Sequence, residues 1–540
     1  MTRRRQLIQA TVILLATWFL GNSSALAVPV PRSSPSAPPP GATTGTLCIP
    51  RERDALLAVK ASFTDRGNYL SSWRGEDDCC QWAGVECSNR TGHVIALQIN
   101  GYTATDNPFA RGAIGGNISS SLLILRHLRY LDLSWNDFGG KPIPEFIGGL
   151  KSLTDLVLTS SNQLVGPIPT LPPSLAYLDL SGNNLSGVLP SDIGAPALAI
   201  LMLFNNSFSG TIPCSLFELQ QLEFLDLSDN KLNGTLPNCR GAPRTSNLTM
   251  LNLNTNNLSG EFPSFLQRCK ELKFLDLAYN NFSGSIPTWI RSKLPDLALL
   301  RLRSNMFSGG IPDELTRMKG LQYLDIASNN ISGKIPISVG NLIAMAHTPD
   351  EQGALYKIVT FGLMSLYRWT NAYDDSLSVV TKGQQLEYTT GIAYMVNIDL
   401  SCNRLTGQIP EEIGSLAALK SLNLSWNHFS GIIPQTIGEL QAVESFDLSH
   451  NELSGEIPTG LADLTSLAHL NLSYNNLTGA IPSGNQLRAL DDQASIYIGN
   501  PGLCGPPVSR NCSEDLSSTI PHGRDFPKFM AQQQCVNVLL

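Results

Sequence analysis

The chain has 540 residues, a formal net charge of −7 and only 15% charged residues. This length allows several globular domains or one long array of repeats. The acidic balance argues against a nucleic-acid-binding protein, because such proteins need a basic face to displace counterions from phosphates. The sequence also lacks the HExxH, GxSxG, P-loop and GxGxxG motifs, so we expect neither an enzyme nor a bound metal or cofactor.

The N-terminus has the pattern of a secretory signal peptide, predicted for residues 1–27. It combines a basic start at 3–5, an apolar run at 11–20 and small residues at 25–27. The apolar run is too short to cross a bilayer; an uncleaved anchor is the alternative. Residues 28–45 are rich in proline and low in complexity, so we predict disorder there. We therefore expect a secreted, apoplastic or cell-surface protein.

Clustered cysteines mark a cap at each end of the mature chain. In a secreted chain such clusters indicate disulfides rather than zinc ligands. An N-terminal cap is predicted at residues 46–92, with a helix from Glu52 to Phe63, and a C-terminal cap at 490–512. Four cysteines allow three pairings, so the first two pairs are a working choice. The expected bridges are Cys48–Cys79, Cys80–Cys87 and Cys504–Cys512.

A leucine-rich repeat with a regular period fills the chain between the caps. The segments at 222–237, 272–287 and 467–482 all fit LxxLxLxxNxLxGxIP. One coil alone cannot bury its leucines, so successive coils must stack into a continuous core. We count 13 clear repeats, preceded by an irregular one near 94–118. They begin at 128, 153, 175, 198, 222, 248, 272, 297, 321, 395, 419, 443 and 467.

This pattern predicts an α/β repeat fold, a right-handed leucine-rich-repeat solenoid. A parallel sheet forms its concave side, and the Gly and Pro of each GxIP prevent regular helices on the convex side. About ten repeats occupy residues 93–346 and four occupy 395–489. Cys214 and Cys239 stand at nearly equal places in successive coils, so a bridge between them is plausible. Cys269 and Cys402 are interpreted as lone core residues.

Three motifs together resemble the ectodomain of plant leucine-rich-repeat receptor-like proteins. They are the cap ERDALLAVK…CCQWAGVEC, the LxGxIP repeat and the closing GNPGLCGPP, and the resemblance covers about residues 48–512. It implies a protein that binds an extracellular peptide or protein ligand in defence or development. Family members continue into one transmembrane helix, whereas the segment at 513–540 holds no apolar run long enough to be one. We predict a disordered tail there.

The array is interrupted between residues 347 and 394. The coil that begins at Leu321 is followed by one at Met395, whereas the regular spacing would start the next coil near position 345. The extra segment is rich in aromatic residues, unlike a linker, and 377–381 alternates like a strand before a Lys382-Gly383 turn. A tolerated loop insertion is the alternative. The resemblance implies an island domain that binds ligand and recruits a co-receptor kinase of the somatic-embryogenesis class, with Lys382 and Tyr388 as its signature residues.

Arg301 and Arg303 are candidate ligand-binding residues on one concave strand. Two guanidinium groups at this spacing can hold a carboxylate or sulfate, and some peptide-binding relatives resemble this arrangement. Asp325, Asp276 and Tyr279 would share the surface. The alternative is that both arginines pair with acidic neighbours such as Asp276 and Asp325, and we favour that alternative.

Asn-x-Ser/Thr sequons recur through the repeats, as expected for a secreted glycoprotein. Two further sequons, Asn423 and Asn471, lie on predicted concave strands, where glycans would displace ligand binding toward earlier coils. Two rivals to a receptor role remain: a truncated decoy, and an inhibitor of microbial cell-wall hydrolases similar to polygalacturonase-inhibiting proteins, which lack an island. The candidate glycosylation sites are Asn89, Asn117, Asn184, Asn257, Asn281, Asn330 and Asn476.

Overall fold

The computed structural model describes most of the chain between the two predicted caps. The described ranges are 47–100, 113–159, 163–239, 246–347, 377–381, 384–388 and 395–512. The predicted signal peptide, the proline-rich segment, most of the island and the tail after residue 512 lie outside these ranges. Within them, no helix is long and apolar enough to span a bilayer.

The N-terminal cap is a helix packed on a small disulfide-linked unit. Helix α2 (Pro50–Ser62) begins at a proline, which fits its first turn because that turn needs no donated N–H. Strand β1 (Phe63–Thr64) pairs with β4 (Gly115–Gly116) of the first coil, and η1 (Cys79–Gln81) precedes the sheet. The bridges Cys48–Cys79 and Cys80–Cys87 are both present, which confirms the predicted pairing.

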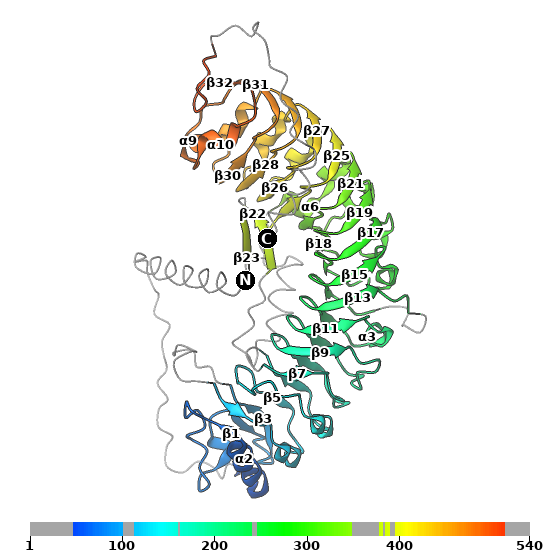
Figure 1. The fold of residues 1–540 in the computed structure, drawn as a ribbon, viewed down its shortest axis with the longest axis vertical. Coiled ribbons are helices and arrows are strands. Elements are labelled where there is room, and N and C mark those ends of the chain that lie inside the picture. The colour runs from blue at the N-terminus through cyan, green and yellow to red at the C-terminus, as the bar shows by residue number, and fades with distance from the viewer. Residues whose placement is uncertain are drawn as a thin grey trace. The chain divides into compact units, whose positions relative to one another are not determined.

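The coils stack into an arc whose inner side is a sheet of 15 strands (Figure 1). All neighbours are parallel except the first pair, β2 and β3. One strand comes from each of the 13 repeats, as predicted. The strands are β2 (Val85–Cys87), β3 (Val94–Gln98), β5 (Tyr130–Asp132), β6 (Asp155–Val157), β8 (Tyr177–Asp179), β10 (Ile200–Met202), β12 (Phe224–Asp226), β14 (Met250–Asn252), β16 (Phe274–Asp276), β18 (Leu299–Arg301), β20 (Tyr323–Asp325), β24 (Asn397–Asp399), β26 (Ser421–Asn423), β28 (Ser445–Asp447) and β30 (His469–Asn471).

A second sheet of 13 strands follows the GxIP side of the coils. Each strand ends near a repeat glycine, most of them at positive φ, a conformation that favours glycine. The strands are β7 (Val165–Gly166), β9 (Asn184–Val188), β11 (Ser207–Gly210), β13 (Lys231–Thr235), β15 (Asn257–Gly260), β17 (Asn281–Ser285), β19 (Met306–Gly309), β21 (Asn330–Gly333), β25 (Arg404–Gly407), β27 (His428–Gly431), β29 (Glu452–Gly455), β31 (Asn476–Ala480) and β32 (Gly502–Cys504).

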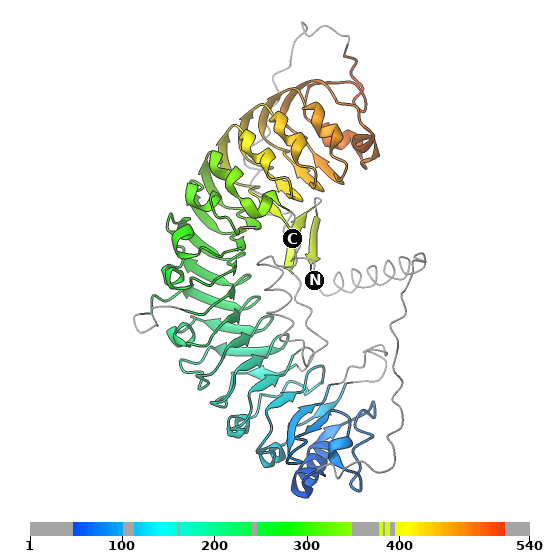
Figure 2. The same cartoon turned by 180° about the vertical axis from the view of Figure 1, so that it is seen from behind.

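Short helical turns complete the outer side of the coils (Figure 2). A proline precedes most of them, so each turn begins abruptly after extended chain. The turns are η2 (Ser120–Ile124), η3 (Glu145–Gly149), α3 (Cys214–Glu218), η4 (Ser264–Arg268), α4 (Ile290–Lys293), α5 (Asp313–Thr316), η5 (Ile337–Asn341), α6 (Ile343–Ala346), η8 (Glu411–Ser415), η9 (Gln435–Glu439) and η10 (Thr459–Asp463). In the C-terminal cap, α9 (Asn485–Ala489) and α10 (Gln493–Tyr497) precede the Cys504–Cys512 bridge, which is also confirmed.

Each coil is held to its neighbours by buried leucines and by one asparagine. Leu275 and Leu277 are fully buried in the common core. The Asn280 side chain donates to the carbonyls of Leu253 (2.9 Å) and Leu277 (3.3 Å) and accepts from the Leu258 N–H (3.0 Å). These backbone groups belong to two successive coils. The asparagine therefore links neighbouring coils by bonding backbone groups of both.

The solenoid continues in register across the island. Strand β20 pairs directly with β24, and Tyr323 lies opposite Asn397 although the whole island lies between them in the sequence. Within the island, β22 (Leu377–Thr381) and β23 (Gln384–Tyr388) form an antiparallel hairpin, which confirms the predicted strand. The predicted turn at 382–383 lies outside the described residues.

The remaining cysteine predictions have mixed outcomes. The Cys214–Cys239 bridge is present, and Cys269 is a free, buried thiol as expected. The interpretation of Cys402 as a lone core residue is wrong. Cys402 is disulfide-bonded. It is half-buried and has φ of 54°, because it occupies the turn before the coil asparagine rather than a leucine position.

Candidate functional site

The inner sheet presents two columns of side chains to its open face. Residues two apart on a strand point the same way, so the first and third residue of each three-residue strand face away from the core. The first column changes character at the island: it is mainly apolar or aromatic before it and polar after it. Before the island it holds Ala96, Tyr130, Asp155, Tyr177, Ile200, Phe224, Met250, Phe274, Leu299 and Tyr323; after it, Asn397, Ser421, Ser445 and His469.

A second hydrophobic cluster lies on this face at the N-terminal end of the column. It is separate from the main core and contains Ala96, Tyr130, Val157, Tyr177 and Met202. Here Val157 and Met202 occupy the third strand position, where most coils have Asp or Asn. The first column is therefore mainly apolar before the island, apart from Asp155, and polar after it.

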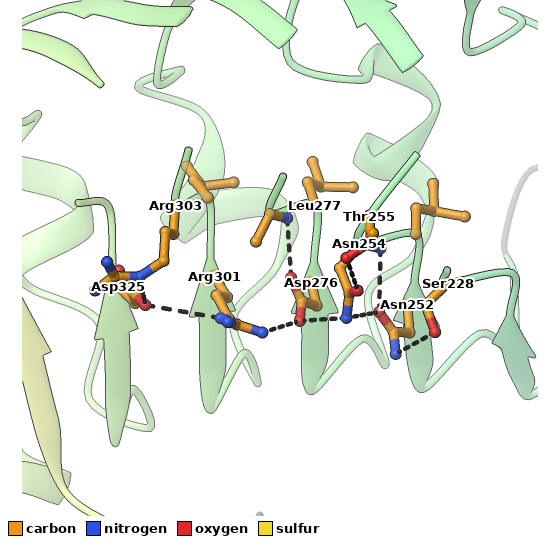
Figure 3. A network of polar contacts seen from close by, with 12 residues as sticks. Ser228, Asn252, Asn254, Thr255, Asp276, Leu277, Arg301, Arg303 and Asp325 are labelled. Atoms are coloured by element: carbon orange, nitrogen blue, oxygen red, sulfur yellow. Dashed lines mark hydrogen bonds and ion pairs between the residues drawn. The ribbon is translucent and has the colours of Figure 1, made fainter. Parts of the chain in front are cut away.

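Third strand positions of the middle coils form an ion-pair network together with Arg303, which lies two residues beyond strand β18 (Figure 3). The Arg301 guanidinium lies 3.0 Å from the Asp276 carboxylate and 3.7 Å from Asp325. The Arg303 guanidinium lies 2.8 Å from Asp325 and also pairs with Asp399. All five side chains are at most 5% exposed. Two cations thus meet three carboxylates in a buried site.

The carboxylates of this network already accept hydrogen bonds within the chain. Asp276 and Asp325 each accept from a backbone N–H two residues on, at 2.9 and 3.2 Å. Asp399 accepts from the hydroxyl and backbone N–H of Ser401, at 2.6 and 3.0 Å. Burial raises the pKa of Asp399 above its ordinary value, and the Arg303 guanidinium acts in the opposite direction. Little of the bonding capacity of these carboxylates is left for a ligand cation or amine.

This geometry decides between the two readings of the arginine pair. The prediction that Arg301 and Arg303 form an open site for a ligand carboxylate or sulfate is wrong. Both guanidinium groups are buried against carboxylates of their own chain. The alternative, pairing with Asp276 and Asp325, is confirmed. Tyr279 shares the site as expected, with the Arg301 guanidinium 5.4 Å from its ring centroid. A ligand role for these five residues stays a prediction.

Sequence reasoning missed Asp399, which lies beyond the island from its partner Arg303. The available signal was its place in the repeat: Asp399 follows Ile398 just as Asp325 follows Leu324. Aligning the coil at Met395 directly with the coil at Leu321 places Asp399 beside Asp325, and so within reach of Arg303. The Arg303–Asp399 pair joins the coils on the two sides of the insertion.

The last coils carry an aromatic stack at the turn before each coil asparagine. The Trp426 and His450 rings stack at 3.6 Å between centroids, and His450 and Tyr474 at 4.3 Å. All three residues have positive φ, which is rare for bulky side chains. Burial lowers the pKa of His450 to about 4, so the imidazole between the two rings is neutral near pH 6. Trp135 occupies the same position in the first clear repeat.

The predicted glycosylation sites leave most of the inner sheet uncovered. All seven candidate asparagines are exposed. Five of them begin strands of the second sheet, namely Asn184, Asn257, Asn281, Asn330 and Asn476. By contrast, Asn423 and Asn471 on the inner sheet are half-buried, and their side-chain oxygens accept hydrogen bonds from Ser425 and Ser473. Glycans at the five second-sheet positions would not occupy the inner sheet.

The two island signature residues are only partly described. Lys382 lies outside the described residues. Tyr388 ends strand β23 and pairs through its backbone with Leu377. Their roles in recruiting a co-receptor stay predictions.

Known leucine-rich-repeat families match the cap and many of the coils. The cap matches the family described as leucine rich repeat N-terminal domain at residues 49–88. Families described as leucine rich repeat match the coils at 125–141, 174–195, 221–240, 247–269, 271–292, 320–342, 395–416 and 419–477.

Curated relatives include two receptor-like proteins of tomato, Solanum lycopersicum. The chain is 46% identical to receptor-like protein EIX1 over 149 residues, which covers 26% of this chain and 14% of that protein. It is 46% identical to receptor-like protein EIX2 over 125 residues, covering 23% and 12%. The matched stretches therefore span far less than two thirds of either relative's length.

A solved structure with similarity is the ectodomain of the Arabidopsis thaliana receptor kinase GASSHO1/SCHENGEN3, in complex with CASPARIAN STRIP INTEGRITY FACTOR 2. The identity is 33% and the TM-score 0.42, with 73% of this chain and 50% of that chain covered.

Proposed function

Because the chain is a leucine-rich-repeat protein similar to plant receptor-like proteins, we propose that it recognises an extracellular peptide or protein ligand. The ligand binds the inner sheet together with the island between residues 347 and 394. The observation that carries this proposal is the inner sheet, which runs through 15 strands in register across the island. The similarity to tomato receptor-like proteins supports the same role.

The inner sheet suits recognition because its outward side chains vary without affecting the core. Each coil keeps its leucines and its asparagine, while the first strand position ranges from Phe224 to Asn397. Such freedom lets one scaffold carry many binding surfaces. The disulfides described above suit an oxidising, extracellular location, either in the apoplast or at the cell surface.

Signalling would require a partner, and we propose a co-receptor kinase of the somatic-embryogenesis class recruited through Lys382 and Tyr388. Ligand binding to the inner sheet and island would present these two residues, so recruitment should depend on ligand. The role is defence or developmental signalling.

A pull-down with the secreted protein tests the proposal. The co-receptor ectodomain is used as bait, with and without plant or fungal apoplastic extracts. The wild type is compared with Lys382→Ala/Tyr388→Ala and with Lys231→Ala, an exposed second-sheet lysine as matched control. Capture that needs an extract and is lost only in the double variant is expected. No capture in any extract would overturn it, and inhibition of a fungal polygalacturonase would then favour the inhibitor.

A further inference from the structure

Buried polar atoms without hydrogen bonds gather in four neighbouring coils, in and beside the ion-pair network. In the part of the chain that the structure describes, these atoms form no hydrogen bond. They are the hydroxyls of Tyr279, Ser304 and Tyr323, Nε of Arg301 and both amide atoms of Asn397. Leaving such groups unpaired costs stability, so native proteins keep them where water or a ligand supplies the missing bonds.

Tyr323 and Asn397 are the centre of this group. They lie directly opposite each other on the adjacent strands β20 and β24, and their exposed fractions are 0% and 1%. Both belong to the first column of the inner sheet, at the place where it changes from apolar to polar. Leu299 precedes them in the column and Ser421 follows. A ligand here would meet apolar side chains on one side and hydroxyl groups on the other.

The charges around the site select an uncharged ligand group. The two guanidinium groups face three carboxylates, so the network has an excess of one negative charge and would repel an anion. The carboxylate oxygens already accept hydrogen bonds, which leaves little for a cation. The free bonding capacity lies mainly on uncharged groups. Asn397 offers one acceptor and two donor hydrogens, and Tyr323 offers a hydroxyl.

We propose that Tyr323 and Asn397 form a binding site for a peptide amide of the ligand, which deepens and rests on the proposed function. The Asn397 side-chain oxygen accepts from the ligand N–H, and its NH₂ group donates to the ligand carbonyl. The Tyr323 hydroxyl donates to the same or the next carbonyl. The adjoining Leu299 packs against an apolar side chain of the ligand. The peptide comes from outside the chain.

Small capped amides provide a probe of this site in the full secreted chain. N-acetyl-leucinamide carries two amides, and N-acetyl-leucine methyl ester lacks the terminal N–H donors. Binding is measured by saturation-transfer NMR titration. We expect the ester to bind about tenfold more weakly than the amide, as for the loss of one well-placed hydrogen bond. Tyr323→Phe should weaken amide binding by a similar factor, and Asn397→Leu should abolish the preference for the amide.

Tyr177→Phe is the matched control, since Tyr177 has the same strand position but its hydroxyl lies 3.3 Å from the Asp179 carboxylate. This variant should bind the amide as the wild type does. Without probe, the Tm of Tyr323→Phe should be unchanged or higher, because the hydroxyl forms no bond in the free protein. A purely structural hydroxyl would give a lower Tm.

Two results would overturn the proposal. One is amide and ester binding that is equal and insensitive to Tyr323→Phe and Asn397→Leu, as expected if water alone fills the site. The other is a lower Tm of Tyr323→Phe with unchanged amide binding, which would mean that another part of the same chain supplies the partner. Neither measurement requires an extract or a co-receptor. Failure of the amide-site proposal can therefore be distinguished from failure of the proposed function in the pull-down.

Discussion

Replacing Arg303 by alanine is the most direct perturbation of the inner-face network. The Arg303 side chain is 5% exposed and pairs with Asp325 and Asp399, each 1% exposed. Alanine leaves both carboxylates buried without their cation. Breaking a buried pair in this way costs about 3–5 kcal/mol. Because Arg303 joins the coils before and after the island, the loss should be concentrated at strands β20 and β24.

The cost should depend on pH in a defined direction. Burial already raises the pKa of Asp399, and Arg303 opposes that rise, so its removal raises the pKa further. A carboxyl with a raised folded-state pKa takes up a proton on folding, and its destabilising effect is relieved as the pH falls. The deficit of Arg303→Ala relative to wild type should therefore be larger at pH 7 than at pH 5.

Hydrogen exchange measured by mass spectrometry reports this loss locally, as the free energy of opening of β20 and β24. Arg317→Ala serves as the control, because its pair with Asp313 is 49% and 58% exposed and is worth about 0.5 kcal/mol or less. A loss under about 1 kcal/mol for Arg303→Ala, equal at both pH values, would refute the reasoning.

Three further predictions concern the scaffold. Asn280→Ala should cost about 1–3 kcal/mol, because the Leu258 N–H loses its partner and the carbonyls of Leu253 and Leu277 each lose one of their donors. Exposed Glu271→Ala should change urea stability by less than about 0.5 kcal/mol, and equal effects would contradict the asparagine's role. Replacing Cys214 and Cys239 by serine should cost about 3 kcal/mol, and a reductant should then lower the Tm of the wild type more than that of the variant. Burial lowers the pKa of His450 from 6.5 to about 4, so the folded state favours the neutral imidazole. The contribution of His450 to stability is therefore complete above pH 6.5 and is lost as the pH falls toward 4. His450→Phe should lose less Tm than the wild type between pH 7 and pH 4, and an equal loss would disprove this.

The repeat itself could be predicted because its determinants are local. Each coil carries its own leucines and asparagine, so the period alone locates the strands and the buried positions. The bridge between Cys214 and Cys239 followed for the same reason: equal places in successive coils lie side by side. The register across the island was also predictable, since the pattern resumes at Met395 with the same spacing.

What could not be predicted from the repeat are contacts that depend on several coils at once. The pairing of Arg303 with Asp399 needs three aligned coils and a choice between solvent, ligand and carboxylate. That the Tyr323 hydroxyl has no hydrogen-bond partner can be seen only once the positions of the surrounding side chains are known. The interpretation of Cys402 as a core residue overlooked its position in the repeat. Tyr279 and Trp426 occupy the same position, directly before the coil asparagine, and do not enter the core.

The central claim is that ligand binds the inner sheet, and a glycan placed there tests it most directly. Met250→Asn/Asn252→Thr creates a sequon on inner strand β14, and Lys231→Asn/Asn233→Thr moves the sequon at Asn233 to the start of second-sheet strand β13. Both secreted variants are assayed for extract-dependent co-receptor capture after their glycan occupancy and Tm are checked. The account predicts that the inner glycan abolishes capture and the second-sheet glycan leaves it intact. Capture that survives a fully occupied inner glycan would contradict it.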